Sequence, residues 1–527
     1  MQPKLLLPFA AAAFVLAVPA AANAAVTSQI NGTTVTFTGD GADDNVTLGV
    51  NDQDQLTHNL GGTNTDFDLG PGVAAPLPSD GSIKIVLNLG AGNDTTNLSA
   101  ADLEDSTING EDGDDIIVGG NNRDTIDGGT GNDRITGFRN LNAEPAEPIS
   151  GGDGNDVMIW NNGDGNDLND GGNGVDETLI TAGTAADNMN VNAAGARTVF
   201  NRVNAAFTVD MGTVEKLNIT SFSGNDVLAT GAGVAMNMVI DAGSGDDTIT
   251  TGDGNDLVNG NDGNDTLNGS GGGDRLVGDR GADTMNGGEA DDTLVWNNGD
   301  GSDVMNGDGG FDRIENNLGG GTDVSTLKPE NGRIRYDRTN VGQFSLSVAT
   351  SEIFELNSLA GDDVLTTSPG VGIPVVADGG AGNDAFNVRD GAAGHFFGGS
   401  GADTATIDAN DTTVDVETVD APPAGQPNPP AGPGHGTIGK TAKYKKGKAA
   451  IKVSCPAGTS GCQGYVTLLY KGREIGRQAY TVGAGQAKTY NVKVSRYKPS
   501  KRKPLTVKYR VSSRAAADKE GKLKLVL

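Results

Sequence analysis

Carboxylates recur every nine residues along part of this 527-residue chain. The longest run contains six aspartates, Asp247, Asp256, Asp265, Asp274, Asp283 and Asp292. A glycine stands two residues before each of the first five, and an apolar residue stands two residues after all six. Calcium prefers hard carboxylate and carbonyl oxygens, and glycine lets a turn bring carbonyl oxygens close to an ion. The spacing therefore indicates a series of calcium sites.

The nine-residue period also predicts the elements that position these carboxylates. Each repeat reads as a glycine turn followed by a short strand whose apolar residue points inward. Two repeats make one 18-residue coil, and stacked coils lie about 4.8 Å apart. Asp265 should therefore lie between Asp247 and Asp283, and Asp274 between Asp256 and Asp292. Asp247 and Asp292 should form the two ends of the stack.

The segment GDGNDLVNGNDGNDTLNG, residues 252–269, resembles the G-G-x-G-x-D-x-U-x nonapeptide of the RTX (hemolysin-type) calcium-binding repeat proteins. The resemblance implies a parallel β-roll in which turn carbonyls and the aspartate at position six bind Ca²⁺. Shorter runs of the motif extend the candidate ligands to Asp115, Asp124, Asp133, Asp156, Asp167, Asp176, Asp303, Asp312 and Asp384. Isolated aspartates at 43, 94, 226 and 363 lack a partner 18 residues on, so little or no calcium binding is expected there.

A metal-free solenoid, in which the aspartates only cap glycine turns, is the alternative to a calcium site. Residues 242–295 hold twelve Asp and Glu against Arg275 and Arg280, a net charge of −10. Stacked like charges destabilise a fold unless cations lie between them. The charge therefore favours bound cations.

The fold class predicted is all-β: a parallel β-roll or β-helix solenoid with β-rich spacers and a small C-terminal β-sandwich. A unit of about 136 residues is duplicated, since the segment from Gly151 recurs from Gly287 and superposes Trp160 on Trp296. These tryptophans could stack on a sugar ring or pack as a wedge over a widened coil, and the wedge is favoured. The predicted order is a signal peptide at 1–24, a spacer at 25–98, calcium repeats at 99–176, a spacer at 177–241, calcium repeats at 242–313, a spacer at 314–378, degenerate calcium repeats at 379–420, a Pro/Gly linker at 421–436 and a basic β-sandwich at 437–527.

The chain ends indicate export and a division of charge. Residues 1–24 contain Lys4, an apolar stretch and a terminal Ala-Asn-Ala, which is typical of a cleaved secretory signal, with a retained membrane anchor as the alternative. The mature chain is thus predicted to be secreted and extracellular, without a membrane span. In an exported chain Cys455 and Cys462 are predicted to form a disulfide, with a metal site as the alternative.

The charge of the C-terminal part is opposite to that of the rest. Residues 437–527 contain 22 Lys and Arg against three acidic residues, a net of +19, and because the whole chain carries −31, residues 1–436 carry −50. The positive charge could serve an anionic cell-wall or extracellular polymer, nucleic acid, or the acidic part of the same chain. The basic part lacks an aromatic-interleaved basic motif, so specific nucleic-acid binding is not expected.

A calcium-binding structural or adhesion protein, and not an enzyme, is the predicted function. The chain has three histidines and neither an HExxH nor a GxSxG motif. Two alternatives stay open: a polysaccharide-acting β-helix enzyme that uses two of the many carboxylates, and a carbohydrate-binding module.

Overall fold

The computed structural model describes residues 26–60, 66–67, 76–100, 105–138, 146–205, 207–340, 342–421, 437–438, 441–445, 448–454, 462–470, 473–482, 486–493, 505–513 and 516–526. These residues form strands and turns without a helix, which confirms the predicted all-β class. No helix that could cross a membrane occurs in this described part of the chain. The chain divides into two compact units, one of Met1–Leu179 with Val209–Val214 and one of Ile180–Thr208 with Glu215–Leu527.

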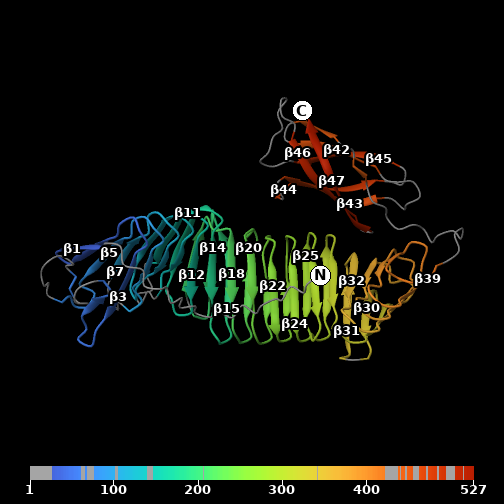
Figure 1. The fold of residues 1–527 in the computed structure, drawn as a ribbon, viewed down its shortest axis with the longest axis horizontal. Helices are drawn as coiled ribbons and strands as arrows, with labels where there is room; N and C mark the ends of the chain where they lie inside the picture. The colour runs from blue at the N-terminus through green and yellow to red at the C-terminus, as the bar shows by residue number, and fades with distance from the viewer. Residues whose placement is uncertain are drawn as a thin grey trace. The chain divides into compact units, whose positions relative to one another are not determined.

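The first unit contains parallel β-solenoid coils whose strands alternate along the chain between two sheets, here called sheet A and sheet B (Figure 1). Parallel pairing joins β2 to β5, β5 to β7 and β7 to β9 in sheet A, and β6 to β8 and β8 to β10 in sheet B. Its sheet A strands are β1 (Thr27–Asn31), β2 (Thr34–Thr38), β5 (Lys84–Asn88), β7 (Asp105–Asn109), β9 (Thr125–Thr130), β11 (Glu147–Gly154) and β13 (Asp167–Gly174). Its sheet B strands are β3 (Asn45–Val50), β6 (Thr95–Asn97), β8 (Ile116–Val118), β10 (Arg134–Thr136) and β12 (Val157–Asn161), with β4 (Leu56–His58) antiparallel to β3. β14 (Glu177–Thr181) and β17 (Phe207–Gly212) include residues of both units.

The second unit repeats this architecture. In residues 242–313 each coil gives one short strand to each sheet, because a nonapeptide is one turn and one strand. The sheet A strands of the unit are β15 (Asn188–Ala194), β16 (Arg197–Arg202), β19 (Val227–Thr230), β21 (Thr248–Thr250), β23 (Thr266–Asn268), β25 (Thr284–Glu289), β27 (Val304–Gly309), β29 (Val324–Glu330), β30 (Arg333–Arg338), β31 (Phe344–Ala349), β33 (Val364–Thr367), β35 (Ala385–Val388), β37 (Thr404–Ile407) and β39 (Thr418–Asp420). The sheet B strands are β18 (Lys216–Thr220), β20 (Asn237–Asp241), β22 (Leu257–Asp262), β24 (Arg275–Arg280), β26 (Thr293–Asn297), β28 (Arg313–Asn317), β32 (Ile353–Asn357), β34 (Val375–Asp378), β36 (His395–Phe397) and β38 (Thr412–Val414).

Strand register places the apolar residue of each nonapeptide over its equivalent in the next coil. Leu267 pairs with Ile249 on one side and with Met285 on the other. All six apolar residues of the longest run are buried, at 1% exposure or less, as predicted. The solenoid core is therefore a narrow column of stacked apolar side chains between the two sheets.

Antiparallel hairpins interrupt the parallel coils in the spacers. β15 pairs with β16, and β29, β30 and β31 form a three-stranded meander. The meander stays connected to the coils, because β31 is parallel to β27 and β29 is parallel to β33.

The C-terminal strands join through hydrogen bonds into one eight-stranded sheet, which is antiparallel except for the pairing of β41 with β47. They are β40 (Thr437–Ile438), β41 (Thr441–Lys445), β42 (Lys448–Ser454), β43 (Cys462–Tyr470), β44 (Arg473–Val482), β45 (Ala487–Lys493), β46 (Leu505–Ser513) and β47 (Ala516–Val526). Residues 1–24, Cys455 and residues 422–436 lie outside the described residues. The signal peptide, the disulfide and most of the linker thus stay predictions.

Candidate metal centre

The aspartates of the longest run stack along the turns of the second unit, and we call this stack the inner ladder. The backbone N–H of Asp247 donates a hydrogen bond to Oδ1 of Asp265 at 2.8 Å, and the N–H of Asp265 donates to Oδ1 of Asp283 at 2.8 Å. On the other edge of the coils Asp256 donates in the same way to Asp274, and Asp274 to Asp292, both at 2.8 Å. The structure thus brings together the pairs that the 18-residue period predicts. In each of these hydrogen bonds, which we call the steps of the ladder, the residue with the lower number donates through its amide and the one with the higher number accepts through its carboxylate.

The second oxygen of most ladder carboxylates is buried and has no hydrogen-bond partner, whereas Oδ2 of Asp124 accepts from the N–H of Gly120. The unpartnered oxygens include Oδ2 of Asp94, Asp115, Asp133, Asp156, Asp226, Asp247, Asp256, Asp265, Asp274, Asp283, Asp292, Asp303, Asp312, Asp363, Asp384 and Asp403. A buried charged oxygen without a partner is costly, so native proteins pair such oxygens with a donor or a metal ion. A row of unpartnered carboxylate oxygens therefore fits a row of cations.

Glycine brings backbone carbonyls to the same place. A Cβ atom added to Gly260 would collide with Oδ2 of Asp265 and would lie 2.8 Å from the carbonyl oxygen of Gly278, one coil further on. A Cβ on Gly269 would meet Oδ2 of Asp274 and the carbonyl oxygen of Gly287 in the same manner. Only glycine fits there, and the space beside it is flanked by a carboxylate oxygen and a carbonyl oxygen. These are the ligand types that Ca²⁺ prefers.

Carboxylate oxygens and glycine carbonyl oxygens are the candidate ligands of such a site. Among the described residues no group of three or more His, Cys, Asp or Glu side chains converges on one point. In the ladder each turn places one carboxylate next to a glycine carbonyl oxygen of the following coil. This composition suits calcium better than zinc, which binds through nitrogen and sulfur side chains.

Burial raises the pKa of the ladder carboxyl groups, because the charged form is desolvated there. Hydrogen bonds from the backbone oppose the shift, and neighbouring aspartates add to it in most cases. The resulting pKa is about 6 for Asp265, about 7 for Asp247, Asp283, Asp292 and Asp303, and about 8 for Asp274 and Asp312. These groups therefore require protons or cations to remain buried at neutral pH.

The inner ladder extends beyond the ends expected from the sequence. The N–H of Asp226 donates to Oδ1 of Asp247 at 2.6 Å, and the N–H of Asp292 donates to Oδ1 of Asp312 at 3.0 Å. The expectation that Asp247 and Asp292 end the stack is thus wrong. Asp303 also joins, because it accepts from the N–H of Asp283 at 2.9 Å. Steps of 20 or 21 residues fit because the added residues form loops outside the repeated strand.

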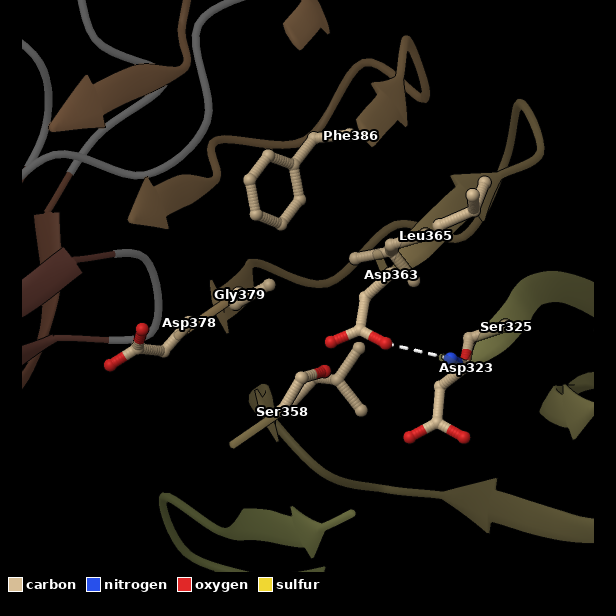
Figure 2. Close-up of a pocket in the computed structure, with 11 residues that line it drawn as sticks. Asp323, Ser325, Ser358, Asp363, Leu365, Asp378, Gly379 and Phe386 are labelled. Atoms are coloured by element: carbon tan, nitrogen blue, oxygen red, sulfur yellow. Dashed lines mark hydrogen bonds between the residues drawn. The ribbon is translucent and has the colours of Figure 1, made fainter. Parts of the chain in front are cut away.

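Aspartates that the sequence leaves isolated are also ladder members. The backbone N–H of Asp94 donates to Oδ1 of Asp115 at 2.7 Å, and the N–H of Asp363 donates to Oδ1 of Asp384 at 2.8 Å. Figure 2 shows the carboxylate of Asp363 directed at the backbone nitrogen of Asp323, which donates to it at 2.6 Å. Asp43 is different, because its neighbour Asp44 takes the ladder position and donates to Asp94 at 2.6 Å.

The first unit contains two such stacks. Asp115, Asp133, Asp156 and Asp176 follow one another, with donor–acceptor distances of 2.8 to 2.9 Å. On the other edge the N–H of Asp124 donates to Oε1 of Glu147 at 2.9 Å, and Glu147 is the register partner of Asp167. Burial, and then the charges of Asp124 and Asp167, raise the pKa of Glu147 to about 11. Three stacked carboxyl groups there also need a proton or a cation.

Sequence reasoning missed the glutamates that receive a ladder hydrogen bond. Besides Glu147, Glu352 accepts from the N–H of Asp312 at 2.9 Å, and Glu417 accepts from Asp403 at 2.6 Å. Each follows an irregular step in the sequence, and the longer side chain reaches the amide of the preceding coil. None of these glutamates lies in a nonapeptide motif. They can be recognised as ladder members only from the pairing of the strands in the structure.

A second row of polar contacts runs outside the inner ladder, formed by the residue that precedes each ladder aspartate. The N–H of Asn264 donates to Oδ1 of Asp246 at 2.8 Å, and the N–H of Ala282 donates to Oδ1 of Asn264 at 3.0 Å. Asp43 belongs to this outer row, since it accepts from the N–H of Asn93 at 2.9 Å. The direction is opposite to that of the inner ladder.

Both tryptophans are buried, at 1% exposure or less, so neither offers a free face to a sugar ring. Trp296 stacks on Phe344 with ring centroids 3.7 Å apart, and its Nε1–H donates to the carbonyl oxygen of Gly301 at 2.9 Å. Trp160 makes the same hydrogen bond to Gly165. The wedge interpretation of the duplicated loop is therefore the correct one.

The ladder geometry predicts different effects for two neighbouring aspartates. Asp265→Asn should lower calcium affinity about tenfold or more and reduce cooperativity, because Asp265 touches the coils before and after it. Asp262→Asn removes the same charge from a side chain that is 61% exposed, and should change affinity less than twofold. Calorimetric calcium titration of both variants measures the difference. Equal losses would show that net charge, and not the stacked position, sets affinity.

The geometry defines the class of protein: a parallel β-solenoid whose turns stack carboxylates beside glycine carbonyls in rows of candidate metal sites. Residues 102–137, 239–267 and 268–295 match the family model of the RTX calcium-binding nonapeptide repeat (4 copies). The chain therefore carries RTX calcium-binding repeats in both units. No curated protein matches it.

Proposed function

We propose that this chain is a secreted calcium-binding repeat protein with a structural or adhesion role, and that its solenoid folds on calcium binding. The observation that carries the proposal is the row of buried, unpartnered Oδ2 atoms beside glycine carbonyls. Calcium held there would neutralise carboxylates that otherwise repel one another, and its binding energy would become folding energy. Asp115, Asp124, Asp133, Asp156, Asp167, Asp176, Asp247, Asp256, Asp265, Asp274, Asp283, Asp292, Asp303, Asp312 and Asp384 are the proposed ligands, together with Asp94, Asp226, Asp363, Asp403 and the glutamates named above.

Ion counting on the chain from residue 25 tests the proposal. After dialysis against calcium we expect several tightly bound ions per chain and cooperative binding, since neighbouring sites share an aspartate. Magnesium at the same concentration is the control and should bind weakly, because it demands octahedral geometry and keeps its waters. One ion or none per chain, or an equal response to both metals, would contradict the proposal.

A role at an anionic surface follows from the charge of the C-terminal part. Residues 437–527 at +19 are joined by the 421–436 segment to residues at −50. A tether raises the effective concentration of each for the other, so the two parts should attract when calcium is absent. Calcium bound to the ladders would weaken that attraction and free the basic part for an anionic cell-wall or extracellular polymer.

Separate chains of residues 25–420 and 437–527 test this regulation at low salt. We expect association in EDTA and at least tenfold weaker association in calcium. Sodium chloride near 0.1 M should weaken it as well, since charges more than about 10 Å apart are screened. Tighter association in calcium would show that the basic part has a different task.

A further inference from the structure

A ladder aspartate directly precedes each hairpin of the second unit, since β15 begins at Asn188 and β29 at Val324. The N–H of Asp187 donates to Oδ1 of Asp226, and the N–H of Asp323 donates to Oδ1 of Asp363, both at 2.6 Å. Asp187 and Asp323 thus stand in the inner ladder as Asp247 and Asp265 do. Their own carboxylates, however, have different neighbours.

A buried arginine accompanies each of these two aspartates. Nε of Arg202 lies 2.6 Å from Oδ1 of Asp187, and Nε of Arg338 lies 2.6 Å from Oδ1 of Asp323. Both arginines are 7% exposed, and the two carboxylates are almost completely buried. In the nonapeptide coils of residues 242–295 the same Oδ1 atom accepts from a backbone N–H, and the ion pairs of Arg275 and Arg280 go to Glu315 and Asp262, which are not ladder aspartates.

The arrangement is the same in both copies of the duplicated unit. Arginine follows aspartate by 15 residues, and an asparagine follows two residues later. Asn204 accepts from the N–H of Asn188 at 3.1 Å, and Asn340 accepts from the N–H of Val324 at 3.0 Å. The asparagine thereby fixes the end of the hairpin beside the first ladder step. Each of the two hairpins therefore places one arginine next to a ladder aspartate.

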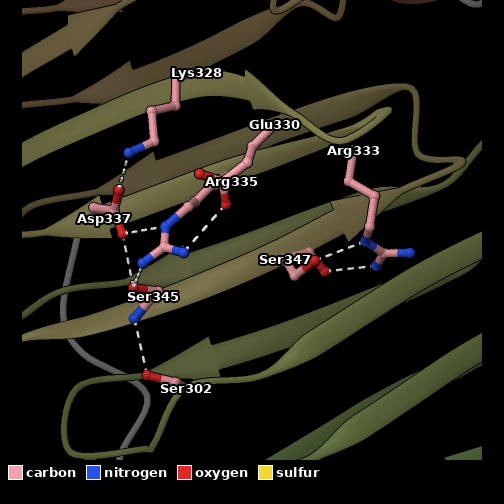
Figure 3. A network of polar contacts seen from close by, with 8 residues as sticks. All are labelled: Ser302, Lys328, Glu330, Arg333, Arg335, Asp337, Ser345 and Ser347. Carbon is pink, nitrogen blue, oxygen red and sulfur yellow. Dashed lines mark hydrogen bonds and ion pairs between the residues drawn. The ribbon is translucent and has the colours of Figure 1, made fainter.

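The rest of the meander is also held by side-chain cations. Figure 3 shows Asp337 between Lys328 and Arg335, at 3.0 and 2.7 Å, and Arg335 reaching Glu330 at 3.2 Å. Residues 323–349 contain four basic and three acidic side chains, a net charge of +1, against −10 in residues 242–295. The meander therefore lacks the excess of negative charge that would require bound metal cations.

We propose that Arg202 and Arg338 are built-in cations that take the place of calcium at the first step of a ladder. The hairpins they belong to then fold without calcium and give the following calcium-dependent coils a preformed edge on which to stack. This inference rests on the proposed function. It assigns to the two arginines a role in holding the first ladder aspartate in place. It also predicts that the fold is independent of calcium in each hairpin and dependent on calcium in the coils that follow.

The proposal predicts what happens when the arginine is removed. Arg338→Met retains most of the side-chain volume but leaves the Asp323 carboxylate buried without its partner, which destabilises a fold strongly. Calcium should then substitute for the guanidinium, because Oδ1 of Asp363 already accepts from the N–H of Asp323 on the neighbouring strand (Figure 2), and Oδ2 of each of these two aspartates is buried without a hydrogen-bond partner. A calcium-independent hairpin should become calcium-dependent.

Hydrogen exchange of residues 323–349 and ion counting on the full chain from residue 25 test the proposal. In the wild type, we expect hairpin protection to change less than threefold between EDTA and calcium. In Arg338→Met, protection should fall at least tenfold in EDTA, recover in calcium, and coincide with one additional calcium ion per chain. Arg335→Met is the matched control on the same hairpin, since its side chain is 40% exposed and pairs with Glu330 and Asp337 and not with a ladder carboxylate. Any protection it loses should be lost equally in EDTA and in calcium, and it should bind no additional ion.

A double variant keeps the test decisive if Arg338→Met does not fold. Arg338→Met with Asp323→Asn removes both charges, so its hairpin should be protected in EDTA and bind no additional ion. Loss of hairpin protection in wild-type EDTA samples, or in the double variant, would overturn the proposal, as would an Arg338→Met hairpin that is insensitive to calcium. Failure of the wild type to bind calcium at all would instead refute the proposed function.

Discussion

Removal of calcium should unfold the coils of residues 242–313 while the hairpin at 323–349 stays folded. The coils of residues 242–295 carry a net charge of −10 with only two arginines, and their ladder carboxylates are buried. Each site filled at 100 times its dissociation constant adds about 2.7 kcal/mol to the free energy of unfolding. Two to five such sites together would add about 5–14 kcal/mol, which is comparable to the 5–15 kcal/mol that typically stabilises a domain. The β signal in far-ultraviolet circular dichroism should fall by a large fraction in EDTA and return with calcium.

Limited proteolysis places this change in the chain. In EDTA the first cuts should fall between residues 242 and 313, and calcium should remove them. Magnesium at equal ionic strength is the control for general screening and should protect poorly. A dichroism spectrum that is the same in EDTA and in calcium would exclude the coupling of binding to folding.

Without calcium, acidification from pH 8 to pH 5 should increase the β structure of the same coils. Burial raises the pKa of the ladder carboxyl groups from 3.8 to about 6 to 8. Between these values the folded chain binds more protons than the unfolded chain, so stability is present at low pH and is lost as the pH rises through 6 to 8. Protons thus act as partial substitutes for calcium. Circular dichroism against pH in EDTA measures the effect.

At limiting calcium, acidification from pH 8 to pH 5 should instead decrease the β structure of these coils. Calcium binds the deprotonated carboxylates, so its affinity should fall as the pH drops from 8 to 5, with protons released on binding. Asp265→Asn should reduce the number of protons released, because it removes one of the buried carboxyl groups whose pKa is raised. If β structure in EDTA decreased on acidification over this window, the ladder carboxyl groups would have to be hydrated and not buried.

The regular part of the fold could be predicted because two periods coincide. The nine-residue spacing places Asp247, Asp265 and Asp283 in one column, and the apolar residue two positions later in the core. Both follow from the pleat and from the length of a coil alone. Calcium as the partner follows from the chemistry of the same oxygens.

The irregular steps could not be predicted, because a loop of any length can join two stacked strands. Asp226 and Asp247 are 21 residues apart and Asp323 and Asp363 are 40 apart, yet both pairs are joined by the ladder hydrogen bond. Only strand register reveals which residues meet across such an insertion. The choice of Asp44 over Asp43, and the burial of Trp296 by Phe344, likewise depend on contacts that no local pattern contains.

The fixed direction of the inner ladder has a consequence for fragments of the solenoid. A cut between two coils leaves a free amide donor on one cut surface and a carboxylate acceptor on the other. The two surfaces are complementary, and they belong to opposite ends of a fragment, so copies would add head to tail without closing a ring. Proteolytic nicking within the coils would therefore produce pieces that polymerise into calcium-dependent filaments.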